Sequence, residues 1–168
     1  IGNDESGKRI LECLKKERVD FIGKQTNGLT GYGFILDSYE KNRTILTYHG
    51  VVDDYKYSEI NKNKLKTKWI FLSSLRGKSI KSQEKIIYWA KERGIKISFN
   101  LDAKRIRDAN LNLKKILKSI DIIIVNKEEA QYLANGKDIK LLAKEIYNLG
   151  PKIIVITYAN EDNTREIS

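Results

Sequence analysis

The sequence lacks most of the residues on which redox chemistry and metal clusters depend. A single cysteine, Cys13, excludes an internal disulfide, and one cysteine with one histidine, His49, cannot supply the ligand spacings of a zinc site. So little cysteine is typical of the reducing cytosol, and we expect a cytoplasmic location. Cys13 falls on the expected apolar side of a helix, so we predict that it is a small core residue.

Further absences exclude whole classes of protein. No stretch reaches the run of about 18 apolar residues that a membrane-spanning helix needs, and the chain opens on a polar run, not a secretory signal, so no membrane partner is expected. The G-x-S-x-G elbow and the second histidine of a hydrolase triad are both missing. Without a Walker A loop, the chain is not a P-loop kinase.

Positive charge, by contrast, is abundant. The chain has 32 Lys and Arg residues against 22 Asp and Glu residues, a net charge of +10. This balance is compatible with a basic nucleic-acid-binding domain, which would show strongly salt-dependent binding. The lysines are spread over nearly every segment, however, as on a solvated exterior, so we do not expect nucleic acid as a partner. The nucleic-acid-binding domain is kept as an alternative function.

The first third of the chain predicts a helix and a β-hairpin. Apolar residues recur at helical spacing over residues 5–18, and Asp4 is a suitable N-cap for that helix. Two segments rich in aromatic and β-branched residues, 30–37 and 43–50, follow on either side of the polar loop 38–42. We therefore predict two antiparallel strands joined by that loop.

The rest of the chain alternates short apolar runs with helical patterns. Four apolar runs, which recur about every 30 residues, are the predicted strands: 68–73, 95–100, 121–125 and 152–157. Helical patterns lie between them, over residues 79–93, 112–119, 128–134 and 139–149. The pattern indicates consecutive βαβ units with right-handed crossovers. The predicted fold class is α/β, a three-layer Rossmann-like parallel sheet with a small β-hairpin appended.

Parallel sheets bind ligands at the carboxyl ends of their strands, so the residues just after each run are the candidates. These residues are Ser73 and Ser74, then Asn100 to Asp102, then Asn126 to Glu129, and Thr157. Asn126 and Glu129 could organise a phosphate and a hydrated Mg²⁺, or they could form a capping box that only stabilises a helix. Ser74 could receive a sugar or form a turn. Thr157 could contact a nucleotide or simply end a strand.

Several segments together resemble the ribokinase-like (PfkB) family of carbohydrate kinases. GNDESG at residues 2–7 and LKKERVD at 14–20 are similar to that family's G-x-D-x-x-G segment and the lysine-rich stretch after it. TGYGFILD and RTILTYHG resemble its paired lid strands, and WIFLSSLRG and SFNLD resemble two of its strand–turn segments. The more specific match is DIIIVNKEEAQYL followed by KIIVITYAN. The resemblance covers essentially the whole chain.

The resemblance implies an ATP-dependent phosphotransferase acting on a sugar hydroxyl, with ATP and Mg²⁺ as cofactors. It implies that Asn126 and Glu129 organise magnesium and phosphate, Glu129 through water, and that Thr157 lies by the nucleotide. Five residues would bind the sugar: Asp4, Tyr32, Phe34, Tyr48 and Ser74. It also implies an α/β core formed by residues 1–28 and 51–168, a lid at 29–50, and a homodimer formed through the lid strands.

The sequence departs from the family pattern in ways that bear on activity. The G-A-G-D motif with its catalytic aspartate is expected beyond Ser168, and the early sugar-binding motif before Ile1, so we expect a fragment without catalytic activity. No catalytic residue is assigned within the chain. Ala159 and Asp162 stand where the family commonly has glycine. A non-catalytic or inactivated kinase-fold protein is therefore the second alternative.

Overall fold

The computed structural model describes residues 1–37, 43–107, 112–159 and 165–167. The chain forms two compact units, each taken by itself below. The first unit comprises Ile1–Lys66 and Arg76–Ser82, and the second comprises Thr67–Leu75 and Gln83–Ser168. Within the described ranges, no helix is both long and apolar enough to cross a membrane.

In the first unit, helix α1 (Glu5–Lys16) begins where the sequence predicts. Asp4 is its N-cap and accepts a hydrogen bond from the backbone N–H of Gly7. The prediction for Cys13 is wrong, because its side chain is exposed. The more buried side of α1 carries Gly7 and Leu14, and consecutive helical residues point about 100° apart, so Cys13 faces away from that side.

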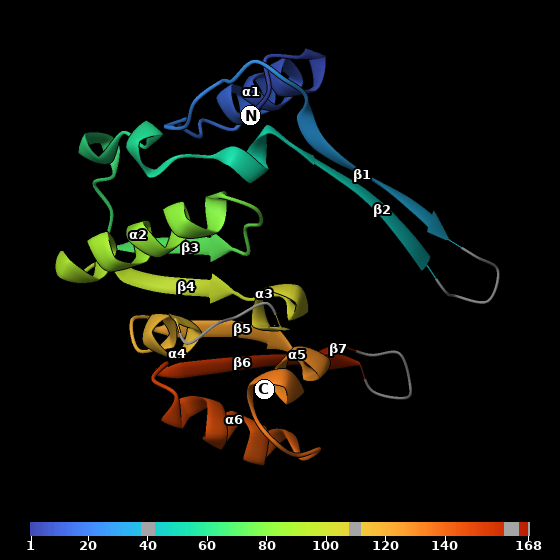
Figure 1. The fold of residues 1–168 in the computed structure, drawn as a ribbon, viewed down its shortest axis with the longest axis vertical. Coiled ribbons are helices and arrows are strands. Elements are labelled where there is room, and N and C mark those ends of the chain that lie inside the picture. The colour runs from blue at the N-terminus through green and yellow to red at the C-terminus, as the bar shows by residue number, and fades with distance from the viewer. Residues whose placement is uncertain (38–42, 108–111, 160–164, 168) are drawn as a thin grey trace. The chain divides into compact units, whose positions relative to one another are not determined.

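The predicted hairpin is confirmed, with both strands at the predicted bounds. Strand β1 (Thr30–Asp37) pairs antiparallel with β2 (Arg43–Gly50) (Figure 1). In this register Tyr32 lies opposite Tyr48. The predicted connecting loop, residues 38–42, lies outside the described residues. After β2 the chain forms three short 3₁₀ segments, Val51–Asp54, Tyr57–Glu59 and Lys62–Lys64.

The second unit is built on the predicted parallel sheet. Its strands are β3 (Trp69–Ser73), β4 (Lys96–Asn100), β5 (Ile122–Asn126) and β6 (Ile153–Ala159), in that spatial order and all parallel. A fifth strand, β7 (Arg165–Ile167), pairs antiparallel with β6 and was not predicted. The predicted fold class, α/β with a parallel sheet and a β-hairpin, is confirmed.

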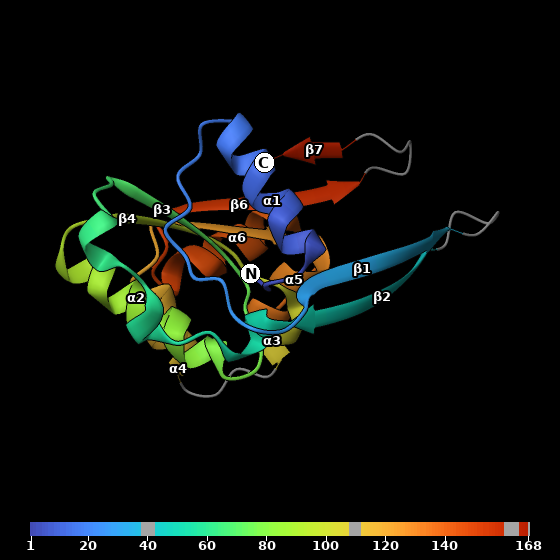
Figure 2. The same ribbon diagram turned by 90° about the horizontal axis from the view of Figure 1, so that it is seen from above.

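The helices of the second unit lie on one face of its sheet, so the described part of this unit supplies two of the three predicted layers (Figure 2). These helices are α3 (Ala103–Arg107), α4 (Asn112–Leu117), α5 (Lys127–Leu133), α6 (Ile139–Asn148) and the part of α2 (Ser79–Glu92) from Gln83 onward. Parallel strands in sequential order, joined by crossovers of one hand, require this arrangement. The covered face is the core, and Ile97, Phe99 and Ile123 there are no more than 1% exposed.

The opposite face of the sheet carries exposed side chains, although the sequence predicted strands that are buried throughout. On that face Trp69, Phe71 and Ile153 are 49%, 63% and 52% exposed. All three belong to β3 and β6, which lie outside the central pair of parallel strands. An apolar run predicts a strand well, but it does not reveal which strand is central.

Two further features differ from the prediction, the end of one strand and one short helix. Thr157 does not end its strand, because β6 continues to Ala159 and pairs with β7 beyond Thr157. The short helix α3 was missed because it begins only three residues after β4. Asp162 lies outside the described residues.

Candidate functional site

The carboxyl edge of the parallel sheet brings the predicted strand-end residues of the second unit into line. Ser73 pairs with Asn100, and Asn126 pairs with Thr157. Directly paired residues point to the same face of a sheet, and so do residues two apart along a strand. Since Asn100 pairs with Ile124, two residues before Asn126, all four side chains belong to one face.

Asn126 and Glu129 form a complete capping box at the start of α5. Asn126 Oδ1 accepts the backbone N–H of Glu129 at 2.8 Å, and Glu129 Oε2 accepts the backbone N–H of Asn126 at 2.7 Å. This confirms the capping interpretation of the motif. Asn126 is exposed and Glu129 is half-buried, so the box also holds an amide and a carboxylate in fixed positions at the solvent-facing edge.

The same two side chains fit a hydrated magnesium ion better than a directly chelated one. Within the described ranges, no group of three or more His, Cys, Asp or Glu side chains is arranged to hold a metal ion. Asn126 and Glu129 offer only oxygen atoms as ligands, which Mg²⁺ prefers, and Mg²⁺ commonly keeps several of its waters. The donor set therefore suits a cation bound partly through water.

Ser74 joins the ends of β3 and β4. Its hydroxyl donates to the carbonyl oxygen of Asn100 at 3.3 Å and accepts the backbone N–H of Asp102 at 2.9 Å. These local contacts are of the kind expected if Ser74 forms a turn. These bonds fix the hydroxyl at the sheet edge, beside the polar face described above.

A buried polar network behind this edge was missed by sequence reasoning. Gln83 donates to the carbonyl oxygen of Ser73 at 2.6 Å, and Arg105 pairs with Glu84 at 2.8 Å. Arg105 is only 8% exposed, and removing one partner of a buried ion pair leaves an uncompensated charge. Asp102 accepts the backbone N–H of Arg105, a local N-cap that the sequence could have revealed. The pairing with Glu84 depends on the fold.

In the first unit, Asp4 has both carboxylate oxygens engaged. Oδ1 accepts the Thr30 hydroxyl at 2.6 Å and the Gly7 N–H at 2.9 Å, and Oδ2 accepts the Thr30 N–H at 2.9 Å. These bonds, the Thr30 hydroxyl first among them, hold the pKa of Asp4 below its ordinary value. Asp4 thus ties the start of α1 to the start of β1.

The aromatic candidates form one cluster on the hairpin. The ring centroid of Tyr32 lies 5.5 Å from that of Phe34, edge to face, and 5.3 Å from that of Tyr48. All three rings are exposed. His49 is half-buried at the end of β2, with Nδ1 3.9 Å from Asp53 Oδ1.

The predicted site residues therefore fall into two sets, one in each unit. Asp4, Tyr32, Phe34 and Tyr48 belong to the first unit, and Ser74, Asn126, Glu129 and Thr157 to the second.

Comparison with solved structures finds several sugar kinases of the same fold. Ribokinase from Giardia lamblia superposes with a TM-score of 0.74 at 19% identity, covering 99% of this chain and 57% of its own. Ribokinase from Thermotoga maritima gives 0.75 at 17% identity, covering 100% and 57%. Fructokinase from Vibrio cholerae, bound to fructose, ADP and calcium, gives 0.73 at 19% identity, covering 99% and 60%. At these identities the likeness shows the fold.

The chain spans less than two thirds of the length of these solved relatives. No curated protein matches it. Residues 1–162, almost the whole chain, match the pfkB family of carbohydrate kinases. The chain belongs to the PfkB family of carbohydrate kinases.

Proposed function

We propose that the chain supplies nucleotide-binding and sugar-binding residues of a cytoplasmic, ATP-dependent kinase that phosphorylates a hydroxyl of a sugar or sugar-like molecule. The observation that carries this proposal is the register of the parallel sheet. It aligns Asn126 and Thr157 on one face at the carboxyl edge, with Ser74 bonded across the neighbouring strand ends. The fructokinase with bound fructose and ADP supports the same ligand classes for this family member.

Asn126 and Glu129 are proposed to hold Mg²⁺, Glu129 through water, and Thr157 to contact the nucleotide. When bound, Mg²⁺ neutralises charge on the phosphates. The capping box serves this role because it fixes the Glu129 carboxylate before any ligand arrives, which reduces the entropy lost on binding.

Asp4, Tyr32, Phe34, Tyr48 and Ser74 are proposed to bind the sugar. The aromatic cluster of the hairpin offers an apolar surface with hydroxyl groups at its rim, which suits a sugar ring. In this proposal residues 29–50 are the lid, and residues 1–28 and 51–168 form the core.

Isothermal titration of the chain with MgATP tests the nucleotide proposal. Glu129→Gln keeps a side chain that can complete the capping box but removes the charge, so we expect about tenfold weaker MgATP binding. Glu128→Gln is the matched control, since it removes the same charge one residue away from the box. Equal effects of the two variants, or no MgATP binding by the unaltered chain, would contradict the assignment.

We assign none of the candidate residues the role of general base for the sugar hydroxyl. We therefore propose that these 168 residues bind ligands without turning them over. Release of ADP by the purified chain in the presence of sugars, above a buffer control, would refute this part of the proposal.

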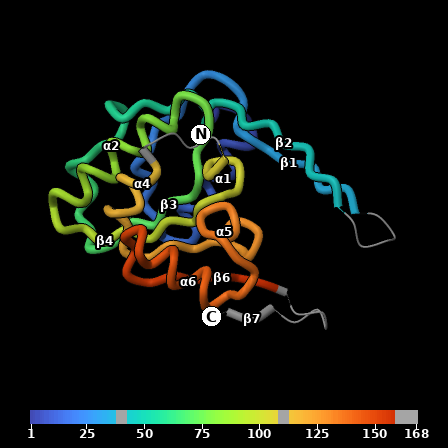
Figure 3. The backbone as a smooth tube through the Cα atoms, turned by 60° about the horizontal axis from the view of Figure 1, so that its bottom comes forward, coloured from blue at the N-terminus to red at the C-terminus, as the bar shows by residue number. Residues whose placement is uncertain are grey.

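The hairpin is also proposed to form a homodimer contact. Figure 3 shows the backbones of β1 and β2 running side by side as a two-stranded hairpin. Ile35 and Ile45 pair on the face opposite the aromatic cluster and are 61% and 50% exposed. That face remains available to a second copy when the aromatic face covers a sugar.

A further inference from the structure

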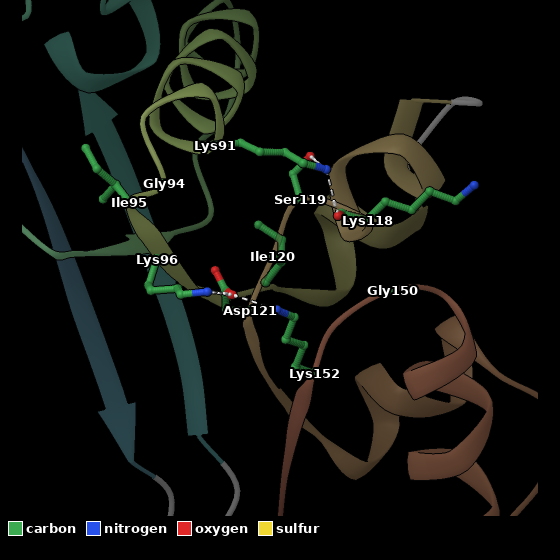
Figure 4. A pocket seen from close by; sticks show the side chains of 10 residues that line it. All are labelled: Lys91, Gly94, Ile95, Lys96, Lys118, Ser119, Ile120, Asp121, Gly150 and Lys152. Carbon is green, nitrogen blue, oxygen red and sulfur yellow. Dashed lines mark hydrogen bonds and ion pairs between the residues drawn. The ribbon is translucent and has the colours of Figure 1, made fainter.

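A pocket lies at the other edge of the sheet of the second unit. It has a volume of about 200 Å³ and is formed where β4, β5 and β6 begin, at the amino ends of the strands (Figure 4). The candidate nucleotide site lies at their carboxyl ends. The lining residues that carry the argument are Lys91, Lys96, Ser119, Asp121, Gly150 and Lys152.

The charged groups of this pocket are mostly cationic. Lys96 Nζ lies 3.0 Å from Asp121 Oδ1, and Lys152 Nζ lies 3.9 Å from the same oxygen. Lys91 Nζ reaches in from the end of α2, whereas the side chain of Lys118, whose backbone lines the pocket, points away (Figure 4). Three ammonium groups therefore lie in a pocket with one carboxylate, which pairs with two of them.

Hydrogen bonds within the protein use only some of the N–H groups of these three lysines. Lys91 donates to the carbonyl oxygen of Lys118 at 3.0 Å and to Ser119 Oγ at 3.4 Å, contacts that stabilise the end of α4. Lys96 donates to Asp121. An ammonium group has three N–H donors, so Lys96 and Lys152 keep N–H groups for a further acceptor.

The wall of the pocket is held in place by backbone contacts. Asp121 Oδ2 accepts the backbone N–H of Ile97, and the carbonyl oxygen of Asp121 accepts those of Lys152 and Ile153. Gly150 has a positive φ of 134° and lies so close to Lys118 that a Cβ would fall 2.6 Å from its Cα. The lysines are thus anchored on a fixed backbone.

We propose that this pocket binds a small dianion of the phosphate class, held by Lys96 and Lys152 with Lys91 at the far wall. The excess of ammonium groups over carboxylates selects an anion. The volume of about 200 Å³ suits a phosphate group with little attached to it and is below the usual range for a whole nucleotide.

The test is a titration of the ¹⁵N-labelled chain with inorganic phosphate at pH 7.5, without nucleotide and at constant ionic strength. The amide signals of Ser119, Asp121 and Lys152 report this pocket, and those of Asn126 to Glu129 report the nucleotide edge. We expect saturable shifts at the first set. The proposal does not depend on MgATP binding, and either site can fail alone.

Three variants sharpen the result. Lys152→Gln should weaken phosphate binding at this pocket about fivefold, whereas the matched control Lys118→Gln should change it less than about 1.5-fold. Asp121→Asn removes the competing carboxylate and should tighten binding about threefold. Equal weakening by Lys152→Gln and Lys118→Gln, or shifts confined to the nucleotide edge, would overturn the proposal. If Asp121→Asn unfolds the chain, the two lysine variants decide.

Discussion

At the scale of single residues, the candidate side chains hold the fold together and also face solvent where a ligand could bind. Asn126 caps α5, Ser74 joins two strand ends, and Asp4 ties α1 to β1. Their local roles could be predicted, because an N-cap depends on neighbouring residues only. The ion pair of Arg105 with Glu84 could not, since the two are 21 residues apart and meet only through the βαβ connection.

Asp4 gives a pH-dependent prediction. Its pKa in the folded chain lies below the ordinary value near 3.8, so its charge stabilises the fold above that value, and this stabilisation is lost as the pH falls through the lowered pKa. Asp4→Asn should therefore lower the melting temperature at pH 7, and the difference from the unaltered chain should shrink towards pH 2.5. Thermal unfolding between pH 2.5 and pH 7 measures this.

The exposed Asp20 provides the control. Asp20→Asn should leave the pH profile of the melting temperature close to that of the unaltered chain. A difference between Asp4→Asn and the unaltered chain that stays constant over the whole pH range would show that the Asp4 carboxylate does not contribute through its charge.

At the scale of elements, the sequence predicted the strands well and their surroundings less well. The four apolar runs were found because parallel strands are continuous β-branched stretches. The exposed side chains of Trp69 and Phe71 were not foreseen, since the position of β3 at the sheet edge follows from topology. Strand β7 was missed because three residues carry too little periodic pattern to be recognised.

The capping box of α5 can be measured separately from ligand binding. Asn126→Ala removes the side-chain acceptor for the Glu129 N–H and should lower the free energy of unfolding by about 1 kcal/mol in urea denaturation. Asn126→Ser keeps an N-cap acceptor and should recover most of the loss. An Asn126→Ala variant as stable as the unaltered chain would mean that the box contributes nothing to stability.

The hairpin predicts a difference between its two faces. Ile35→Thr with Ile45→Thr should shift the chain towards monomer in sedimentation velocity, because these side chains supply apolar contact on the proposed dimer face. Phe34→Ser, on the aromatic face, should leave the dimer intact. A monomeric unaltered chain, or loss of the dimer in Phe34→Ser alone, would contradict this assignment of the faces.

At the scale of the whole molecule, the charge of +10 does not define a function by itself. In the second unit, part of this charge comes from lysines at the amino edge of the sheet, where Lys96 pairs with Asp121 and Lys91 donates to the carbonyl oxygen of Lys118. The functional information lies instead in strand direction. Four strands run the same way, so the polar residues that end them meet at one edge.

The most direct test of this account is a titration of the ¹⁵N-labelled chain with MgADP, followed by amide chemical shifts. We expect the amides of Ser74, Asn126 to Glu129 and Thr157 to shift together and to saturate at one common affinity. Saturable shifts confined to the amino edge around Asp121, or no saturable shift at all, would contradict the assignment of the carboxyl edge as the nucleotide site.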